Sequence, residues 1–321
     1  MRFLKDFLLL TGLMLATCAY ANGNDIAAHT EIIPISSMTL TDQQMLSGDD
    51  RGKPVTIAGV LRLASGNQRQ PVVMLIHGSS GVGPNIEMWE RKFNALGIAT
   101  FALDGFSGRN IMSTSRDQSQ LGRLNLILDA YRALGELVKN PRVDPSKVFL
   151  MGFSRGGQAT LYASLTRLQR MWNTSGATFA AYIPFYPDCM TSFKDDTNVA
   201  GPIREFHGAA DDYDPPAACA AYFRRLQAAG RDAQMTIFAG ANHAFDMPTP
   251  MPIVVAKGAQ TVRACKILEN DRHQLINADT DRPFSFDDDC VQFDPHVGAD
   301  PVARDTAIRE VTNYVQSMII R

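Results

Sequence analysis

A serine stands between two glycines in the stretch "MGFSRGG", directly after the apolar run "KVFL". Gly152 and Gly156, two positions before and two after Ser154, indicate a turn so tight that side chains there would collide. A turn of this kind can hold a serine exposed, where its oxygen can attack an electrophile. Because a serine hydroxyl is a weak nucleophile, it needs a base beside it, and the rest of the chain has to supply one.

Polar residues also follow two later apolar runs that the sequence predicts as strands. The run ending at Phe206 is followed by "HGAADDYDP", and the run ending at Phe238 by "AGANHAFD". Ligands of doubly wound sheets collect at the carboxyl ends of strands, so we expect Ser154, Asp211 and His243 to meet there. His243 would then take the proton of Ser154 and return it to the leaving alcohol, while Asp211 would hold the imidazole tautomer.

Two other aspartates, Asp188 and Asp212, compete for the acid role. We predict Asp211, because it stands on the turn that leaves the strand, where a carboxylate can reach an imidazole on the next loop. His77 and His207 each precede a glycine at a predicted strand end. We expect both of these histidines to be packed and hydrogen-bonded rather than catalytic.

The oxyanion formed in acyl transfer needs two N–H donors. We predict the backbone N–H of Arg155, in the first turn of a helix, and that of Ser79, in the glycine-rich turn "HGSSGVG". Arg109, in "FSGRN", is expected either to bind a substrate carboxylate or to form a structural salt bridge. Aromatic residues near strand ends are predicted to line the pocket: Phe106, Phe153, Tyr186, Tyr213 and Phe245.

The elements that must position these residues alternate along the chain. The predicted strands are "EIIPIS", Val55–Leu63, Pro71–Ile76, Ile98–Leu103, Val148–Gly152, Ala177–Pro184, Ile203–His207 and Gln234–Phe238. The predicted helices are Asn85–Leu96, Gln118–Val138, Arg155–Gln169, Pro216–Gly230 and Pro301–Ile320. This alternation predicts an α/β fold, with a mostly parallel, doubly wound sheet and an antiparallel edge formed by the opening strands.

Neither an internal repeat nor a linker divides the chain, so we predict one domain over residues 22–321. Its exception is an irregular excursion over about residues 247–300, rich in Pro, Asp and Asn. A connection of that length exceeds ordinary loops, and we expect it beside the site. Its acidic run "DDDC" fits a solvated loop better than a calcium site.

The N-terminal stretch "MRFLKDFLLLTGLMLATCAYA" has the three parts of a secretory signal peptide, with cleavage predicted after Ala21. Its apolar run is too short to span a membrane. A lipoprotein cleavage site before Cys18 is the alternative. We therefore predict export to the periplasm or the medium.

Four cysteines remain after that cleavage: Cys189, Cys219, Cys265 and Cys290. An even number in an exported chain indicates two disulfides, for which three pairings are possible. We predict the sequential pairing, Cys189 with Cys219 and Cys265 with Cys290; four free buried thiols are the alternative. The absence of any C-x-x-C spacing argues against zinc.

The stretch "FHGAADDYDPPAACAAYFRRLQAAGRDAQMTIFAGANHAFD" resembles the dienelactone hydrolase-like family of the α/β hydrolases. The family patterns G-x-x-D-x-x-x-P and G-x-x-H-x-F fall on the segments of Asp211 and His243. The order Ser, Asp, His, with the serine in G-x-S-x-G, is that of the α/β-hydrolase fold. Dienelactone hydrolases carry a cysteine nucleophile, so Ser154 makes this chain resemble the serine esterase members instead.

With 321 residues, 45% hydrophobic, 20% charged and a formal net charge of −2, the composition is that of an ordinary globular protein. It lacks the basic excess of a nucleic-acid binder. We expect a serine hydrolase that cleaves small-molecule carboxylic esters through an acyl-enzyme on Ser154, without a metal or an organic cofactor. A peptidase or acyltransferase with the same triad, and a non-catalytic binding protein of this fold, are the alternatives. The intact triad argues against the last.

Overall fold

The computed structural model describes residues 29–320. Its main sheet has eight strands in the order β1-β2-β4-β3-β5-β6-β8-β9. These strands are β1 (His29–Thr39), β2 (Lys53–Leu63), β3 (Gln70–Ile76), β4 (Ala99–Asp104), β5 (Val143–Phe153), β6 (Tyr182–Phe185), β8 (Ile203–Gly208) and β9 (Ala233–Phe238). Neighbouring strands from β4 to β9 run parallel, whereas β1–β2 and β2–β4 are antiparallel. The predicted sheet with an antiparallel edge is confirmed.

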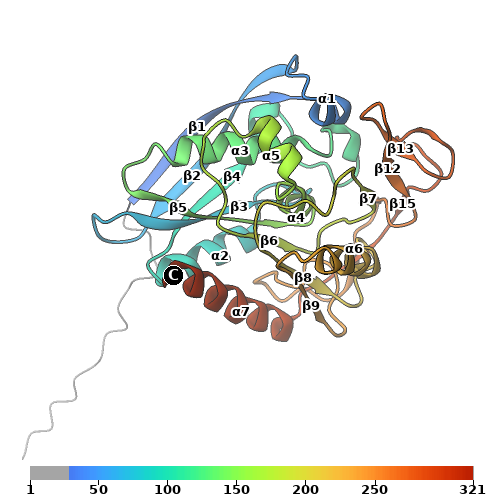
Figure 1. Cartoon of the computed structure of the whole chain (residues 1–321). Coiled ribbons are helices and arrows are strands. Elements are labelled where there is room, and N and C mark those ends of the chain that lie inside the picture. Colours follow the sequence, from blue (N-terminus) through green and yellow to red (C-terminus); the bar gives the residue numbers. More distant parts are fainter. Residues whose placement is uncertain (1–28, 321) are drawn as a thin grey trace, which may run out of the picture.

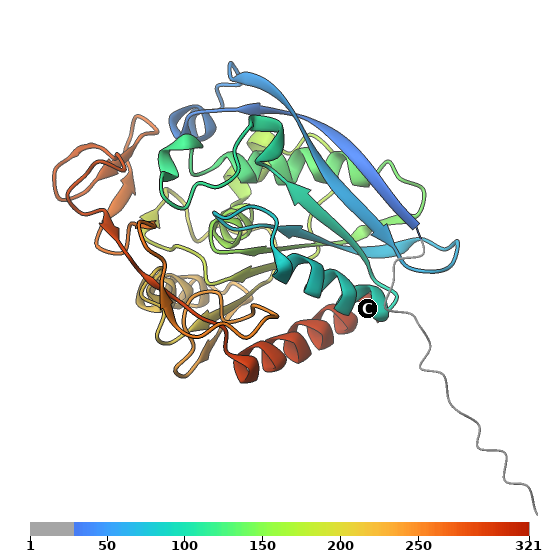
Figure 2. The same cartoon turned by 180° about the vertical axis from the view of Figure 1, so that it is seen from behind.

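Helices cover both faces of this sheet (Figures 1 and 2). One face carries α3 (Asn125–Leu137), α4 (Arg155–Tyr162), α5 (Thr166–Trp172) and α6 (Pro216–Ala228). The other carries α2 (Pro84–Ala95) and α7 (Pro301–Ile320), which pack against each other. A short helix, α1 (Asp42–Ser47), follows β1.

Strand β3 shows why the central strands are continuous apolar runs in the sequence. Val72, Met74 and Ile76 face the core under α3, while Val73 and Leu75 face the core under α2. All five are fully buried. A strand that is covered on both faces needs apolar residues at every position rather than at every second one.

The predicted helix over 118–138 is wrong in its first part. The chain forms a single 3-10 turn at Gln118–Gln120, and α3 begins only at Asn125. The Arg155 side chain donates hydrogen bonds to the carbonyls of Leu121 and Gly122, and more weakly to that of Gln118. Leu121 has an extended backbone here, with φ of −143° and ψ of 129°, so one continuous helix cannot run through this stretch.

Two other predicted boundaries also differ. The helix predicted over 155–169 is broken between α4 and α5, where Leu165 pairs with Val199 and the N–H of Thr166 donates to the carbonyl of Asn198 at 2.9 Å. The strand predicted over 177–184 is reduced to β6. These partners lie far along the chain, so local periodicity does not show them.

The excursion after β9 is less irregular than its composition indicates. It holds seven short strands: β10 (Val254–Val255), β11 (Gln260–Thr261), β12 (Ile267–Glu269), β13 (Leu275–Asn277), β14 (Arg282–Pro283), β15 (Gln292–Phe293) and β16 (His296–Val297). Strand β12 pairs with β7 (Thr191–Ser192), which follows β6. The excursion, orange in Figure 1, is therefore anchored to the main body beside α6.

Both disulfides join the cysteines in sequential order, as predicted. Cys189 bonds Cys219, which ties the loop after β6 to α6. Cys265 bonds Cys290 within the excursion.

The predicted leader, including Cys18, lies outside the described residues. Within residues 29–320, no helix combines the length and hydropathy that a membrane span requires.

Candidate active site

Ser154 stands at the junction of β5 and α4 in a backbone conformation that only a tight turn imposes. Its φ of 53° and ψ of −117° fall outside the regions that L-residues prefer. A Cβ on Gly152 would lie 2.2 Å from the carbonyl oxygen of Gly156, and one on Gly156 would lie 2.3 Å from that of Ile76. The glycines that flank the serine are thus needed because β5, α4 and β3 approach one another here without room for side chains.

The structure brings the three predicted residues into one hydrogen-bonded line. The Ser154 hydroxyl lies 2.9 Å from Nε2 of His243. On the other side of the ring, Nδ1 of His243 lies 2.8 Å from Oδ2 of Asp211. Asp211 follows β8 and His243 follows β9, so both come from the carboxyl ends of the parallel strands, as does Ser154. The other candidate acids lie elsewhere: Asp212 binds His296, and Asp188 binds Arg123.

Packing fixes the ring of His243. It lies between Tyr213, which stacks on it at a centroid distance of 4.6 Å, and Tyr186, whose edge contacts it at 4.6 Å. The carbonyl of His243 accepts a hydrogen bond from the N–H of Gly298, at 3.0 Å. The end of the excursion therefore also holds the histidine loop in place.

Asp211 is surrounded by donors. Its Oδ1 accepts hydrogen bonds from the backbone N–H groups of Tyr213 and Asp214, both at 2.9 Å. Its Oδ2 is shared by His243 and by Nε2 of His207, which lies 3.4 Å away. Although burial opposes ionisation, these donors and positive rings hold the pKa of Asp211 well below its ordinary value.

His207 carries positive charge deep under the site. Its Nδ1 lies 2.7 Å from a carboxylate oxygen of Glu205, and its Nε2 lies 2.6 Å from the carbonyl oxygen of Asp214. Burial opposes the charge, but Asp211 and Glu205 outweigh it and raise the pKa of His207 to about 10. We predicted a packed, hydrogen-bonded histidine at position 207, and the structure places its ring next to Asp211.

The charge on Asp211 also acts on His243. Burial disfavours the imidazolium form, but the attraction of Asp211 is larger, and the pKa of His243 is raised above its ordinary 6.5. The nearby His207 cation opposes that rise. A neutral His243 next to the serine is therefore reached only above the pH at which a free histidine loses its proton.

The loop after β3 lies against the serine. A Cβ on Gly78 would come within 3.3 Å of Cβ of Ser154 and 3.2 Å of the carbonyl oxygen of Phe153. Ser79 is fixed there, because its carbonyl accepts from the N–H of Thr114 at 2.8 Å and its hydroxyl accepts from Nε2 of Gln118 at 3.0 Å. This position is compatible with the predicted role of the Ser79 N–H, which stays a prediction together with that of Arg155.

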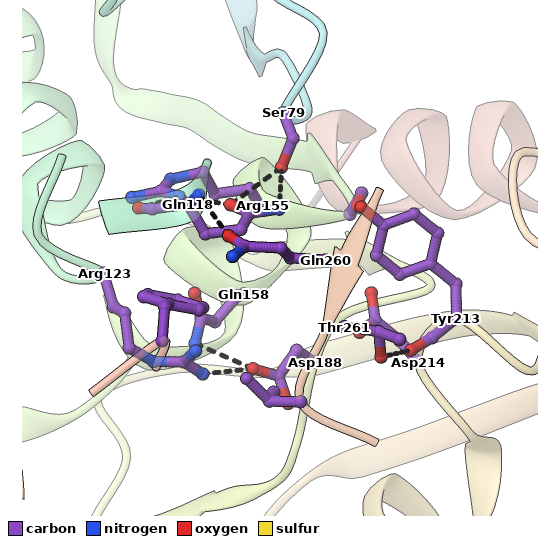
Figure 3. A pocket seen from close by; sticks show the side chains of 13 residues that line it. Ser79, Gln118, Arg123, Arg155, Gln158, Asp188, Tyr213, Asp214, Gln260 and Thr261 are labelled. Carbon is purple, nitrogen blue, oxygen red and sulfur yellow. Dashed lines mark hydrogen bonds and ion pairs between the residues drawn. The ribbon is translucent and has the colours of Figure 1, made fainter. Parts of the chain in front are cut away.

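Two cavities meet at Ser154. One has a volume of about 300 Å³ and is largely apolar; its walls include Phe153, Tyr186, Tyr213, Met247, Met251 and Val297. The other has a volume of about 40 Å³ and is polar; Figure 3 shows its walls. The polar cavity is lined by Ser79, Gln118, Arg123, Arg155, Gln158, Asp188, Tyr213, Asp214, Gln260 and Thr261, among others.

Three of the predicted pocket residues are not among the residues that line either cavity. Arg109 forms a buried bidentate ion pair with Asp129, at 2.7 and 3.0 Å, and also donates to the carbonyl of Met38. Of the two expected roles of Arg109, the structure therefore supports the structural salt bridge, because every guanidinium nitrogen already has a protein acceptor. Phe106 packs against His77 in the core under α3, and Phe245 lies behind Tyr186.

A family model described as the dienelactone hydrolase family matches residues 57–270. The chain belongs to the dienelactone hydrolase family. Its members are hydrolases, so this protein is one, and its α/β-hydrolase fold agrees with the sheet described above. No match was found among curated proteins.

Solved structures resemble this family member at low sequence identity, and they show the fold alone. A dienelactone hydrolase-like promiscuous phosphotriesterase from metagenomic libraries is 17% identical, with a TM-score of 0.54, over 90% of this chain and 98% of its own. The protein named m3DLH is 18% identical, with a TM-score of 0.56 and the same two coverages. Esterase 2 of Thermogutta terrifontis, phosphoramylated by tabun, is 18% identical, with a TM-score of 0.50, over 68% of this chain and 86% of its own.

The sequence predicted that the excursion lies beside the site, but it did not indicate Asp214 or the individual excursion residues that line the two cavities. Gln260 and Thr261 line the polar cavity, and Met247 and Met251 line the apolar one. Asp214, only a few positions after Asp211 in "ADDYDP", could have been suspected from that spacing. The excursion residues gave no such signal, because its strands are too short to show a period. Its part after residue 270 also lies beyond the family match.

Proposed function

We propose that this dienelactone hydrolase family member is a serine hydrolase that cleaves carboxylic esters through an acyl-enzyme on Ser154. The observation that carries the proposal is the line of Ser154, His243 and Asp211 at 2.9 and 2.8 Å, with the serine held on a strained turn. That order of groups is the one in which a histidine can activate a hydroxyl while an acid stabilises the resulting imidazolium.

In the proposed reaction His243 takes the proton of Ser154 as its oxygen adds to the ester carbonyl. The negative oxygen then accepts hydrogen bonds from the backbone N–H groups of Arg155 and Ser79. His243 gives the proton to the leaving alcohol, and the acyl group remains on Ser154. A water molecule, deprotonated by the same histidine, releases the acid and restores the serine. The proposed chemistry uses only these side chains, the two backbone N–H groups and water.

The proposed route is tested by Ser154→Ala, measured on p-nitrophenyl butyrate. The variant should lose activity down to the roughly 10³-fold residual that binding and the oxyanion donors give over water. Ser146→Ala is the matched control, because Ser146 lies at the opposite end of β5 and, within residues 29–320, its hydroxyl binds only Asp144. Wild-type turnover in the Ser154 variant, with its circular dichroism unchanged, would refute the proposal.

We also propose that the protein is exported, by a signal peptide cleaved after Ala21, to the periplasm or the medium. The two disulfides support this, because such bonds persist in oxidising compartments. N-terminal sequencing of the secreted protein tests it; an intact N-terminus on a cytoplasmic protein would count against it.

A further inference from the structure

The polar cavity beside Ser154 contains polar groups that the protein does not satisfy. The side-chain carboxyl of Asp214 accepts no hydrogen bond from the described residues; its nearest partner, Nδ1 of His243, lies 3.9 Å away. Gln260 uses its oxygen to accept from the N–H of Gln118 at 2.8 Å, and within residues 29–320 its amide nitrogen has no acceptor. Gln158 donates to Asp188 at 3.3 Å, and no described residue donates to its oxygen.

These three side chains line the cavity in Figure 3, and two of them are almost completely buried. Asp214 is 7% exposed and Gln158 is 3% exposed. Burial raises the pKa of Asp214 to about 8. Buried polar groups without partners are unfavourable, so a ligand with its own hydrogen-bonding groups would be favoured at this place.

The arginines around the cavity use their terminal nitrogens for protein acceptors, and among the described residues the buried Nε of Arg123 and of Arg155 has no partner. Arg123 binds Asp188 and Thr191, and the Arg155 guanidinium binds Gln118 and the Leu121 carbonyl. An anionic group would have to lie beside the carboxyls of both Asp188 and Asp214, which line the same small cavity. A hydroxyl suits the remaining groups, because it can donate to Asp214 or Gln158 and accept from Gln260.

The size of the cavity limits what enters it. One water molecule needs at least about 10–15 Å³ of such space. A volume of about 40 Å³ therefore holds only a few non-hydrogen atoms, such as a hydroxyethyl unit. The apolar cavity, which is also lined by Ser154, has a volume of about 300 Å³ and is large enough for a hydrocarbon chain.

We propose that the polar cavity is a subsite for a short hydroxylated group of the ester substrate, read by Asp214, Gln158 and Gln260, while the apolar cavity takes the hydrocarbon group. The proposal rests on the proposed function and names the substrate class: esters with a small hydroxyl-bearing part on one side and an aliphatic chain on the other. Gln260 comes from the excursion after β9, so this selectivity depends on the excursion as well as on the main sheet.

The test compares isosteric esters in which a methyl group replaces the hydroxyl. One arm sets hydroxyethyl hexanoate against propyl hexanoate; the other sets hexyl 3-hydroxypropanoate against hexyl butanoate. In one arm, the wild-type protein should favour the hydroxylated ester by on the order of 10-fold in kcat/KM. The arm that shows the preference identifies whether the alcohol or the acyl part enters the polar cavity.

Asp214→Leu should lower that ratio to about one or below. Gln260→Met, at a residue that is hydrogen-bonded to Gln118 rather than to the triad, should reduce the ratio in the same direction. The ratio is informative even if the variants turn over more slowly, because changes in the triad affect both esters of a pair alike. Asp50→Leu, at an exposed position near β2, is the control and should leave the ratio unchanged. Equal rates within both wild-type pairs, or an unchanged ratio in both cavity variants, would overturn the proposal.

A binding measurement separates this proposal from the proposed function. Calorimetry with Ser154→Ala should show hexyloxyethanol binding more tightly than hexyl propyl ether, on the order of 10-fold, since neither compound can be hydrolysed. If the protein hydrolyses no ester, the proposed function fails, and this pair of ethers still decides whether the hydroxyl subsite exists. Equal affinities would remove the subsite even in an active esterase.

Discussion

Asp211→Asn tests how the acid orients the histidine. Two backbone N–H groups, those of Tyr213 and Asp214, already donate to Oδ1 of Asp211 at 2.9 Å. An asparagine at this position would keep its carbonyl oxygen towards those two donors. Its NH2 group would then face Nδ1 of His243, where the aspartate now presents Oδ2 at 2.8 Å.

A donor in that place reverses the imidazole tautomer. Nδ1 would have to accept, so the proton would move to Nε2, the atom that must take the proton of Ser154. The loss should therefore reach about 10⁴-fold in kcat, equivalent to roughly 5.5 kcal/mol in the activation barrier. The fold should survive, because the asparagine keeps both backbone hydrogen bonds.

The measurement is the hydrolysis rate of p-nitrophenyl butyrate at saturating substrate. Asp212→Asn and Asp188→Asn are the controls; they remove the ion pairs with His296 and Arg123, and they should cost far less than Asp211→Asn. The carboxyl of Asp214, 3.9 Å from Nδ1, could partly replace the acid, and the double variant with Asp214→Asn would reveal such rescue. A loss below 10-fold in both the single and the double variant would refute the reasoning.

Three further predictions follow from the contacts around the site. In the pH profile of kcat/KM, the rise on the acid side should have its midpoint above pH 6.5, because Asp211 raises the pKa of His243. His207→Gln should move this midpoint to still higher pH, because it removes a cation that opposes the rise in pKa. A midpoint at or below pH 6.5, or a shift to lower pH in the variant, would contradict this. Gly156→Ala should destabilise the fold by about 1–3 kcal/mol or more, because its Cβ would lie 2.3 Å from the carbonyl oxygen of Ile76. Gly135→Ala in α3, whose Cβ would have its nearest contact at 3.6 Å, should instead stabilise the fold by up to about 1 kcal/mol. Urea unfolding measures both changes, and equal effects of the two variants would contradict the prediction. The two disulfides join cysteines 30 and 25 residues apart, and reducing each bond should lower the free energy of unfolding by about 3–4 kcal/mol. An unchanged melting temperature after full reduction would show that the bonds do not stabilise the fold.

The sequence predicted the parts of the site that come from regular elements. Ser154 and the loops of Asp211 and His243 each follow an apolar run, and parallel strands bring their carboxyl ends to one edge. The disulfide pairing was also predicted correctly. It is the sequential one of the three pairings that four cysteines allow.

Contacts between distant segments could not be predicted. Arg155 binds the carbonyl of Leu121, where the predicted helix over 118–138 does not form, and Arg109 finds Asp129 on a helix that follows it. A single sequence shows that these arginines exist but not which acceptors surround them. The same limit concealed the polar cavity, whose walls come from several separate stretches of chain, Gln260 of the excursion among them.

The most direct test of the acyl-enzyme on Ser154 is mass spectrometry of the protein after reaction with an ester under acid quench. With p-nitrophenyl butyrate, peptide mapping should find one butyryl group on the peptide that contains Ser154, and none in Ser154→Ala. A butyryl group on another residue, or rapid hydrolysis with no protein-bound acyl group at any quench time, would contradict the account.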